Sequence, residues 1–387
     1  MLNEQTLFWG SAFLILYPYV GYVGVLWLLA RFKQPQSSES VSFPTRKVTL
    51  LISAYNEEAT IEHKIRNSLA LAYPKDLLEI VVVSDGSTDK TCEIVSRYAA
   101  VGLKLRHYEG RMGKTSCLNR AVPLAEGEII VFSDANAHYP PNTIAELVRH
   151  FDDPKVGFVT GSTRYVTTIE NHTEAVGESM SLYARFQHLI KDLESTVGSC
   201  IGADGAIFAI RKSYYEELDH VDINDLVLPL KILKRGAVGK LASGAVCTED
   251  AVGSPQAQFC RQVRIANRTI RALIKNIDLA NPLKFGLISF QLLSGKVLKM
   301  LCPIFMVVLL ISNLCLLKQH WLYALSFLAQ FTVYSMVWLT SEGITLWRLS
   351  RGLSVAHTFI VVNLAIGLGW LQYLKGETYA TWAPVRR

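Results

Sequence analysis

Four long apolar stretches interrupt this 387-residue sequence. The first covers residues 7–30 and contains no charged residue, and three more follow near the carboxyl end, at 297–317, 321–340 and 353–374. Each has the length that an α-helix needs to cross roughly 30 Å of hydrocarbon. The middle of the chain is polar enough to be soluble. We therefore expect one soluble domain joined to membrane-spanning helices.

Basic residues near the apolar stretches predict an orientation. They are Arg31, Lys33 and Arg46 after the first stretch, and Arg348 and Arg351 between the last two. The positive-inside rule then places the amino terminus outside and the soluble domain in the cytoplasm. Four crossings would leave the carboxyl end outside, against which Arg386 and Arg387 argue. A cleaved signal peptide is the alternative for residues 7–30, but the stretch is long and lacks a basic leader.

The same pattern divides the chain into segments. We expect a transmembrane helix over 1–32, a linker over 33–46, a soluble domain over 47–280, three transmembrane helices over 297–375 and a tail over 376–387. Residues 281–296 place Lys284, Gln291 and Lys296 among apolar positions. That pattern predicts an amphipathic helix at the membrane surface, and a buried soluble helix is the alternative.

The soluble domain alternates short β-branched runs with helical patterns. The predicted strands are 48–53, 79–84, 103–107 and 128–133, and the predicted helices are 57–70, 90–99 and 115–125. Such alternation is typical of an α/β fold with a mostly parallel sheet. Ligands bind beyond the carboxyl ends of the strands in such sheets, so the residues after each strand are the candidates for chemistry.

The polar residues after the second predicted strand, 85–89, suit a nucleotide. Capping of the next helix would explain Ser87, Thr88 or Asp89, but not Asp85 at the strand end. An Asp85 carboxylate beside the Tyr55 ring could accept a hydrogen bond from a nucleobase while the ring stacks on it.

The residues after the fourth predicted strand suit a metal. Asp134 and Asn136 offer oxygen ligands for Mg²⁺ or Mn²⁺ beside a diphosphate, although a loop cap is an equally good explanation of Asp134 alone. Lys114 follows Gly113 at a helix start, where a phosphate would be favoured. The sequence is not an ATPase-type phosphate loop, because Tyr108 stands where that motif requires glycine.

Composition excludes some other classes of function. The seven cysteines include no CxxC pair, so neither a zinc site nor a redox pair is indicated, and free thiols agree with a reducing compartment. The net charge of +6 could favour anionic lipids and a phosphorylated substrate, but no nucleic-acid-binding motif accompanies it. The apolar stretches hold few polar groups, with Glu342 at an edge, which argues against a transporter.

In this order and spacing, the strand-end motifs resemble those of family 2 glycosyltransferases of the GT-A fold. They are Ala54-Tyr55-Asn56-Glu57, Ser84-Asp85-Gly86-Ser87-Thr88-Asp89, Gly113-Lys114 and Ser133-Asp134-Ala135-Asn136. The resemblance is to membrane-integrated polysaccharide synthases, such as the hyaluronan, chitin-oligosaccharide and cellulose synthases, and covers nearly the whole chain. It implies a Rossmann-like cytoplasmic domain with α-helical transmembrane segments in an inner or plasma membrane.

The resemblance also implies roles for these residues. Tyr55, Glu57, Asp85 and Lys114 would bind the nucleotide diphosphate, and Asp134 would bind both the nucleotide and a Mg²⁺ or Mn²⁺ ion. Asn136 replaces the second aspartate of the family's DxD motif, which weakens the metal site without removing it.

Two segments compete for the family's catalytic base. Thr248-Glu249-Asp250 spells the family's TED motif, but Ile223-Asn224-Asp225 has the expected distances from Asp134 and from the QxxRW-like segment. Asp225 also opens a predicted helix over 226–235. We therefore expect Asp225 to be the general base, with Glu249 or Asp250 as the alternative.

The QxxRW-like segment is Arg261-Gln262-Val263-Arg264-Ile265, in which the family's Gln and Trp are absent. Arg264, with Arg261 nearby, would bind the diphosphate, and Ile265 replaces a Trp that lies near the acceptor. Gly202, Ala203 and Asp204, followed by Gly205, resemble the family's acceptor-side loop, although an ordinary tight turn would have the same sequence.

These features predict an inverting glycosyltransferase that uses a nucleotide diphosphate sugar, with a UDP-sugar the usual family donor. The expected product is a growing polysaccharide, and transfer of a single sugar to a lipid-linked acceptor is the alternative. A non-catalytic membrane protein that binds sugar nucleotides is the alternative of another class. Expected partners are the donor, a carbohydrate or lipid-linked acceptor, membrane lipids, and export or regulatory proteins, with no nucleic acid.

Overall fold

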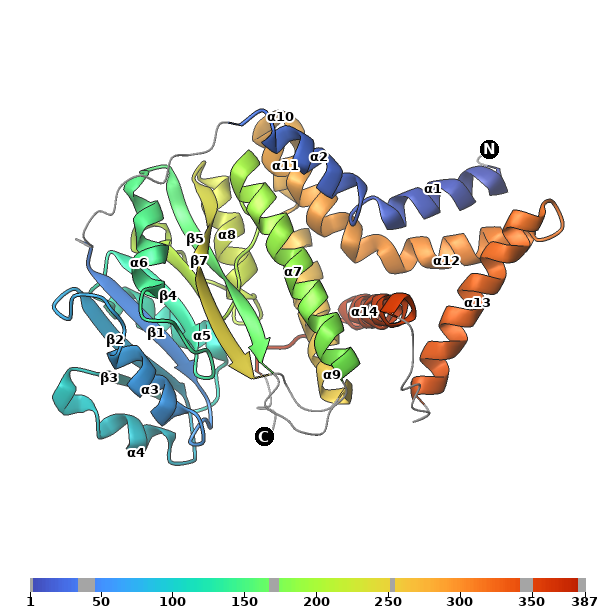
Figure 1. Cartoon of the computed structure of the whole chain (residues 1–387). Coiled ribbons are helices and arrows are strands. Elements are labelled where there is room, and N and C mark those ends of the chain that lie inside the picture. The colour runs from blue at the N-terminus through green and yellow to red at the C-terminus, as the bar shows by residue number, and fades with distance from the viewer. Residues whose placement is uncertain (1–2, 34–45, 167–173, 251–254, 342–350, 382–387) are drawn as a thin grey trace.

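A seven-stranded sheet forms the centre of an α/β domain (Figure 1). The computed structural model describes residues 3–33, 46–166, 174–250, 255–341 and 351–381. Its strands are β1 (Val48–Ala54), β2 (Leu78–Asp85), β3 (Lys104–Tyr108), β4 (Ile129–Asp134), β5 (Val156–Val166), β6 (Ile207–Arg211) and β7 (Val238–Asp250). Their order is β3-β2-β1-β4-β6-β5-β7, and only β6 runs antiparallel to its neighbours. The predicted α/β class with a mostly parallel sheet is confirmed.

Helices cover both faces of this sheet. The domain helices are α3 (Ile61–Leu69), α4 (Thr91–Ser96), α5 (Lys114–Ala121), α6 (Thr143–Val148), α7 (Glu174–Val197), α8 (Asn224–Lys234) and α9 (Pro255–Lys275). Single 3-10 turns lie at Ala99–Val101, Val122–Leu124, Arg149–Asp152, Lys212–Tyr214 and Ile277–Ala280. Side chains of α3, α4 and α6 join one core cluster, and side chains of α5, α8 and α9 join the other.

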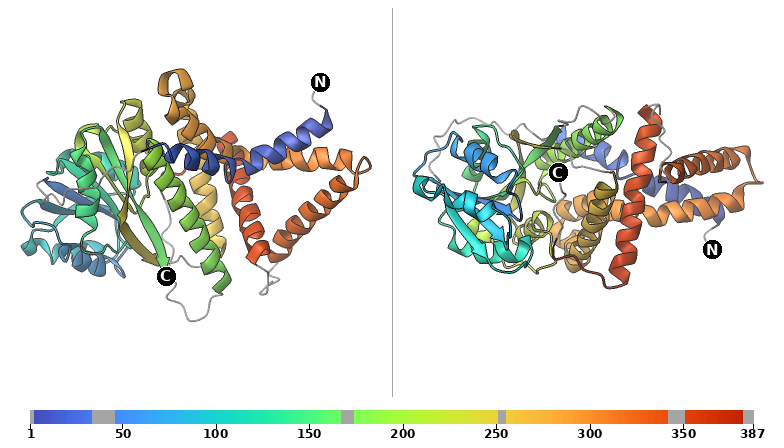
Figure 2. Two further views of the ribbon diagram at one scale, coloured as in Figure 1. Left: turned by 45° about the horizontal axis from the view of Figure 1, so that its top comes forward. Right: turned by 90° about the horizontal axis from the view of Figure 1, so that it is seen from below.

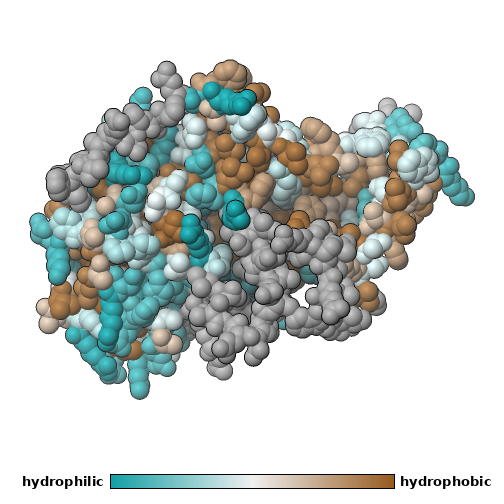
Figure 3. All heavy atoms as spheres, in the orientation of Figure 1, coloured by the Kyte–Doolittle hydropathy of each residue, from teal (hydrophilic) through white to brown (hydrophobic). Residues whose placement is uncertain are grey.

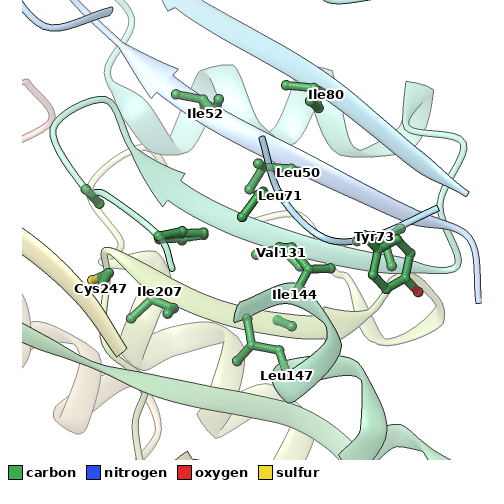
Figure 4. Close-up of a cluster of buried hydrophobic side chains, with 14 of the residues drawn as sticks. Leu50, Ile52, Leu71, Tyr73, Ile80, Val131, Ile144, Leu147, Ile207 and Cys247 are labelled. Atoms are coloured by element: carbon green, nitrogen blue, oxygen red, sulfur yellow. The ribbon is translucent and has the colours of Figure 1, made fainter. Parts of the chain in front are cut away.

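The two cores follow from the alternation of side chains along the strands. Leu50 and Ile52 of β1 belong to the first core, whereas Leu51 between them belongs to the second, and all three are fully buried. Figure 4 shows the first core, with Leu50, Ile52 and Val131 of the sheet above Ile144 of α6. Burial of each such side chain contributes roughly 1.5–3 kcal/mol, so the alternation fixes which face of the sheet each helix covers.

The first apolar stretch forms two helices rather than one. Helices α1 (Glu4–Leu16) and α2 (Gly21–Ala30) meet at a bend of 51°. Pro18 lies in the break, and proline has no backbone N–H to continue a helical hydrogen-bond ladder. The chain therefore leaves the direction of α1 before it reaches the soluble domain.

Helices α1, α12 (Leu298–Leu316) and α13 (Trp321–Ser341) extend away from the sheet (Figure 1). The amino end of α1 lies beside the turn between α12 and α13, where the Gln5 side chain donates a hydrogen bond to Gln319 at 3.2 Å. The Phe8 and Tyr323 rings meet edge to face, with centroids 5.1 Å apart. Hydrophobic residues gather over these helices, whereas the sheet domain is largely hydrophilic (Figure 3).

Helix α14 (Arg351–Leu374) crosses α12 instead of running beside it, as the two views of Figure 2 show together with Figure 1. It packs along α9, where the Asn267 side-chain amide donates to the Gly369 carbonyl at 3.5 Å. Trp370 Nε1 donates to the Met300 carbonyl at 2.8 Å. Helix α14 is therefore fixed to the soluble domain and to the base of α12.

The predicted amphipathic segment breaks at Gly286, whose φ of 52° lies in the left-handed region. Helix α10 (Pro282–Phe285) precedes it, and α11 (Leu287–Leu292) continues through a π-helical turn (Leu293–Val297) into α12. By length and composition, two segments could cross a membrane, Leu287–Leu316 and Val355–Leu374. The bent pair of α1 and α2 would be a third if it counts as one span. Residues 34–45 of the predicted linker, together with Glu342, Arg348, Arg386 and Arg387, lie outside the described residues.

Candidate active site

The strand ends that carry the predicted site residues lie side by side. In the sheet, Ala54 of β1 pairs with Ser84 of β2, and Ser53 of β1 pairs with Asp134 of β4. Tyr55 and Asp85, one residue beyond these pairs, therefore emerge at the same edge as Asp134. The parallel register explains why Tyr55 and Asp134, 79 positions apart, can share one site.

The loop after β1 is fastened to the loop after β2. Asn56, which has a φ of 53°, accepts a hydrogen bond from the Thr88 N–H at 2.8 Å, and the Glu57 N–H donates to Thr91 Oγ1 at 2.8 Å. The Glu57 carboxylate accepts from Thr60 Oγ1 at 2.7 Å. The Tyr55 ring lies 4.0 Å from the Arg111 guanidinium carbon. The Tyr55 ring thus lies against Arg111, its contact with a nucleobase stays a prediction, and Glu57 stabilises the start of α3.

Asp85 is buried and its carboxylate holds the loop that precedes α5. Its oxygens accept from the Met112 N–H at 2.8 Å and from the Gly113 N–H at 3.1 and 3.0 Å, and Cys117 Sγ donates at 3.2 Å. The contact with a nucleobase that the sequence suggested stays a prediction. In this structure the carboxylate positions Lys114 through its neighbour Gly113.

Lys114 and Asp134 form an ion pair at the centre of the strand edge. Lys114 Nζ lies 2.5 Å from Asp134 Oδ1, and the two side chains are 17% and 34% exposed. Asn136, two residues on, is partly buried. Opposite charges in direct contact attract more strongly at a partly buried place than in bulk water. A diphosphate and a cation could exchange for these two partners, because one is a cation and the other an anion.

A buried lysine that the sequence did not single out supports the Asp134 loop from behind. Lys64 of α3 is fully buried, donates to the Ala137 carbonyl at 2.5 Å and lies 3.9 Å from the centre of the Tyr139 ring. Burial lowers the pKa of Lys64 to about 7. The hydrogen bond from Lys64 therefore holds the loop that carries Asp134 and Asn136 to α3.

Asp225 lies in the first turn of α8, as the sequence predicted, and belongs to the same site. Its Oδ1 atom is buried without a hydrogen-bond partner among the described residues. Burial raises the pKa of the Asp225 carboxyl, and so do the Asp204 and Asp134 carboxylates, whereas Lys114 and Arg268 lower it. An acceptor hydroxyl could supply the missing hydrogen bond to Oδ1.

The predicted acceptor loop lies directly against Asp225. The Ala203 N–H donates to the Asp225 carbonyl at 2.8 Å, and a Cβ at Gly205 would lie 2.6 Å from Asp225 Oδ2. Thr163 Oγ1 donates a hydrogen bond to the Asp204 carboxylate at 2.8 Å. Glycine at 205 is therefore required for the approach of the catalytic candidate, and Asp204 fixes the loop to β5.

Glu249, the alternative base, also borders the site. It is buried on β7 beside Tyr165 of β5, and the pKa of its carboxyl is raised to about 7 by burial and by the nearby Asp134 carboxylate. Arg261 acts in the opposite direction. Asp250 ends β7, and its side chain lies outside what the structure describes.

Helix α9 presents basic residues at helical spacing. Arg261, Arg264 and Arg268 are three and four residues apart, so they share one face of the helix. Burial and the Arg261 charge lower the pKa of Arg264. Arg268, which the sequence reading missed, donates to the Val221 carbonyl at 3.0 Å and to the Asp222 carbonyl. It therefore fixes the turn that leads into Asp225, while Ile265 on the same helix is partly buried.

The segment after α14 returns to the site, which the sequence did not indicate. The Arg271 guanidinium donates to the Glu377 carbonyl at 3.2 Å, and the Tyr379 hydroxyl lies within electrostatic range of Arg264. A Cβ at Gly113, whose φ is 90°, would lie 2.3 Å from the Ala380 carbonyl oxygen. The carboxyl-terminal segment thus lies between α9 and the Lys114 loop.

The chain matches the family model described as glycosyl transferase family 2 over residues 49–219. It is 33% identical over 187 residues to a beta-monoglucosyldiacylglycerol synthase of Trichormus variabilis, covering 46% of this chain and 39% of that protein. It is 29% identical over 212 residues to a poly-beta-1,6-N-acetyl-D-glucosamine synthase of Staphylococcus aureus, covering 52% of this chain and 49% of that one. The chain therefore spans less than half the length of these two relatives.

A solved structure has the same fold over almost the whole chain. It is a mannosyltransferase from Pyrobaculum calidifontis in complex with GDP-Man and Mn²⁺, with a TM-score of 0.74. The match covers 96% of this chain and 99% of that one, at 23% sequence identity. The similarity extends beyond the sheet domain, so the arrangement of the apolar helices belongs to the shared fold.

Proposed function

We propose that this chain, whose residues 49–219 match the glycosyl transferase family 2 model, is a member of that family and transfers a sugar from a nucleotide diphosphate sugar to an acceptor hydroxyl, with inversion at the anomeric carbon. The observation that carries the proposal is the Asp225 carboxylate, which lies beside the 202–205 loop and has a buried oxygen without a hydrogen-bond partner among the described residues. Lys114 and Asp134 lie close enough to Asp225 to change its pKa. A protein that only binds sugar nucleotides has no need of such a carboxylate. This argues against the non-catalytic alternative.

The donor would bind along the strand edge. Tyr55 would stack on the base, with a UDP-sugar as our first choice, and Lys114 would pair with the diphosphate after exchanging its Asp134 partner. Arg261 and Arg264, which share one face of α9, would provide further charge-assisted hydrogen bonds. Asp85 would act indirectly, by holding the Gly113 backbone next to Lys114.

The reaction needs a base on the acceptor side and positive charge on the donor side. Asp225 would take the proton of the acceptor hydroxyl while its oxygen attacks the anomeric carbon. The bond from that carbon to the diphosphate would break in the same step, and Lys114 and Arg264 would stabilise the negative charge on the departing nucleotide. A single displacement of this kind inverts the anomeric configuration.

A divalent cation fits the acidic side chains that gather here. The Asp134 and Asp204 carboxylates lie close enough to Asp225 and Glu249 to raise the pKa of both, and Lys114 is the ion-pair partner of Asp134. The described residues contain no group of three His, Cys, Asp or Glu side chains suited to hold a metal. Because the protein alone offers too few such ligands, Asp134 and Asn136 would hold Mg²⁺ or Mn²⁺ together with oxygens of the donor diphosphate. The cation would neutralise charge on the leaving diphosphate.

A panel of nucleotide sugars tests this function. The purified full chain should release the nucleoside diphosphate from one donor in a reaction that needs Mg²⁺ or Mn²⁺, and chromatography of the nucleotide measures the release. Product size with labelled donor then separates two acceptors, because a ladder means elongation of a polysaccharide and a single band means one addition to a lipid-linked acceptor. No release from any uridine, guanosine, cytidine or thymidine diphosphate sugar would refute the proposal.

We also propose a membrane arrangement. Helix α1 lies beside α12, and α13 leaves the turn after α12 at an angle to both (Figures 1 and 2). The bent pair of α1 and α2, together with α12 and α13, would cross the bilayer, whereas α14 crosses α12 and would lie along the membrane surface despite its length and composition. The amino terminus and the α12–α13 turn would then face outward together, and the carboxyl-terminal segment, which contacts α9, would share the cytoplasm with the site. The basic residues Arg31 and Lys33 would also lie inside, as the positive-inside rule requires.

Two native cysteines can test this arrangement. Cys315, in the last turn of α12, and Cys260, on α9, are both exposed. A membrane-impermeant maleimide applied to intact cells should label Cys315 and not Cys260, whereas both should react in opened vesicles. Cys260→Ser and Cys315→Ser variants assign the label by mass. Labelling of Cys260 in intact cells would exclude a cytoplasmic site.

A further inference from the structure

A lysine at the base of α12 lies beside the proposed catalytic aspartate. Lys296 belongs to the π-helical turn Leu293–Val297, and π-helical turns are rare and frequent at functional sites. A Cβ at Gly202 would lie 3.7 Å from Lys296 Nζ and 3.8 Å from the Asp225 carbonyl oxygen. The ammonium group therefore contacts the same loop that borders Asp225.

Lys296 and its neighbour Lys299 have no acidic partner in direct contact. Within the described part of the chain, neither ammonium group makes a hydrogen bond or an ion pair. Lys299 Nζ lies 5.6 Å from the centre of the Tyr19 ring and 5.9 Å from that of Phe186. Both lysines are partly buried, so an anion that binds beside them would stabilise their charged forms.

The nearby carboxyl groups already have other partners. Glu194 accepts from the Tyr22 hydroxyl at 2.7 Å, and burial raises the pKa of Glu194 although Lys296 and Lys299 lower it. A third lysine, Lys191, lies 3.9 Å from Asp204, whose carboxylate is hydrogen-bonded to Thr163. The carboxyl groups therefore leave the ammonium groups at 296 and 299 available to a ligand.

Apolar residues lie on the other side of these lysines, along α2, α11 and α12. Tyr22 and Leu26 of α2 form a buried cluster with α7 residues and with Phe290 of α11, next to the π-helical turn. Further along, Ile304 and Val307 of α12 are exposed large hydrophobic residues. A ligand whose anionic group meets the lysines would therefore extend along apolar helices.

We propose that Lys296 and Lys299 bind the phosphate of a lipid-linked saccharide phosphate, and that this amphiphile is the acceptor. The proposal rests on the proposed function. A base at Asp225 requires an acceptor hydroxyl, the two ammonium groups require an anion, and the adjoining helices suit a hydrocarbon chain. A saccharide joined to a lipid through phosphate supplies all three. A neutral glycolipid or an uncharged polysaccharide would leave both ammonium groups without a partner.

Binding of farnesyl phosphate and farnesol to the purified full chain in neutral detergent tests the site. Farnesyl phosphate should bind at least about tenfold more tightly than farnesol, as expected for a charge-assisted contact. Lys296→Met should remove this preference and Lys296→Arg should retain most of it. Lys284→Met, which removes an exposed lysine of α10, is the matched control and should bind like the native chain. Equal binding of phosphate and alcohol, or an unchanged preference in Lys296→Met, would overturn the proposal.

Two further measurements separate the possible failures. Inorganic phosphate alone should compete weakly, and competition as strong as that of farnesyl phosphate would show an anion site without a lipid and would overturn the lipid assignment. Nucleotide release from the donor reports the proposed function independently. Farnesyl phosphate binding without any nucleotide release would refute the function while supporting the site, and release with equal binding of the two probes would refute the lysine site alone.

Discussion

Replacement of Asp225 by asparagine should lower the turnover number about 10³-fold, within the range that a positioned general base contributes. The amide has the size of the carboxyl but cannot take a proton from the acceptor. It fits because Oδ1 has no partner to lose, and Oδ2 packs against Gly205. The KM for the donor should change little, since Lys114 and the α9 arginines remain. Initial rates with the donor found in the nucleotide-sugar panel measure both constants.

The pH profile gives the same prediction a second readout. Burial raises the pKa of Asp225, so native turnover should fall as the pH drops through that raised value, because a protonated carboxyl cannot act as a base. Glu249→Gln is the matched control, since Glu249 is a buried carboxyl in the same site. We expect a smaller loss there. A greater loss in Glu249→Gln than in Asp225→Asn would make Glu249 the base.

The sheet and its functional edge could be predicted because their signals are local. The runs 48–53, 79–84, 103–107 and 128–133 agree with β1 to β4 to within one residue at each end, since an apolar β-branched run between turn residues has few other structures to adopt. Parallel pairing then brings Tyr55, Asp85 and Asp134 to one edge without further information. The helical pattern over 226–235 correctly predicted that Asp225 lies at the start of α8, whereas its role as the general base stays a prediction.

The supporting contacts could not be predicted, because they join distant segments. Asp85 at a strand end suggests a contact with a ligand, and nothing in the sequence shows that its carboxylate accepts a hydrogen bond from the Gly113 N–H instead. A signal existed for Lys64, which occupies the buried face of α3 with Ile61 and Ile65. Because a buried lysine is unfavourable without a hydrogen-bond partner, its position on this face predicts a polar partner inside the protein, and the structure shows that this partner is the Ala137 carbonyl.

Hydropathy identified apolar helices but not their directions. Pro18 inside the stretch 7–30 indicates a break between α1 and α2, and the structure has a bend of 51° there. Helix α14 is as apolar as a membrane span, yet its course across α12 depends on packing against α9 and Met300. Composition cannot distinguish a helix that crosses a bilayer from one that lies against apolar neighbours.

Replacement of Asp134 by alanine should lower the turnover number at saturating Mn²⁺ about 10²- to 10³-fold, as expected when stabilisation of the leaving group is lost. It should also raise the Mn²⁺ concentration needed for half-maximal rate. Asp134 is the one ionised side chain of the Asp134-Ala135-Asn136 segment, and removing it leaves Lys114 without its ion-pair partner. Mn²⁺ titration of nucleotide release measures both effects.

Asn136→Ala separates the metal from the ion pair. A neutral amide is a weaker ligand than a carboxylate, so this variant should need more Mn²⁺ but keep a larger part of the turnover number than Asp134→Ala. Lys114→Met removes the other partner of the ion pair. Because Lys114 would pair with the diphosphate, this variant should raise the KM for the donor without changing the Mn²⁺ requirement. If Asp134→Ala instead changed only the donor KM, in the manner of Lys114→Met, Asp134 would serve to position Lys114 and the metal would have to bind elsewhere.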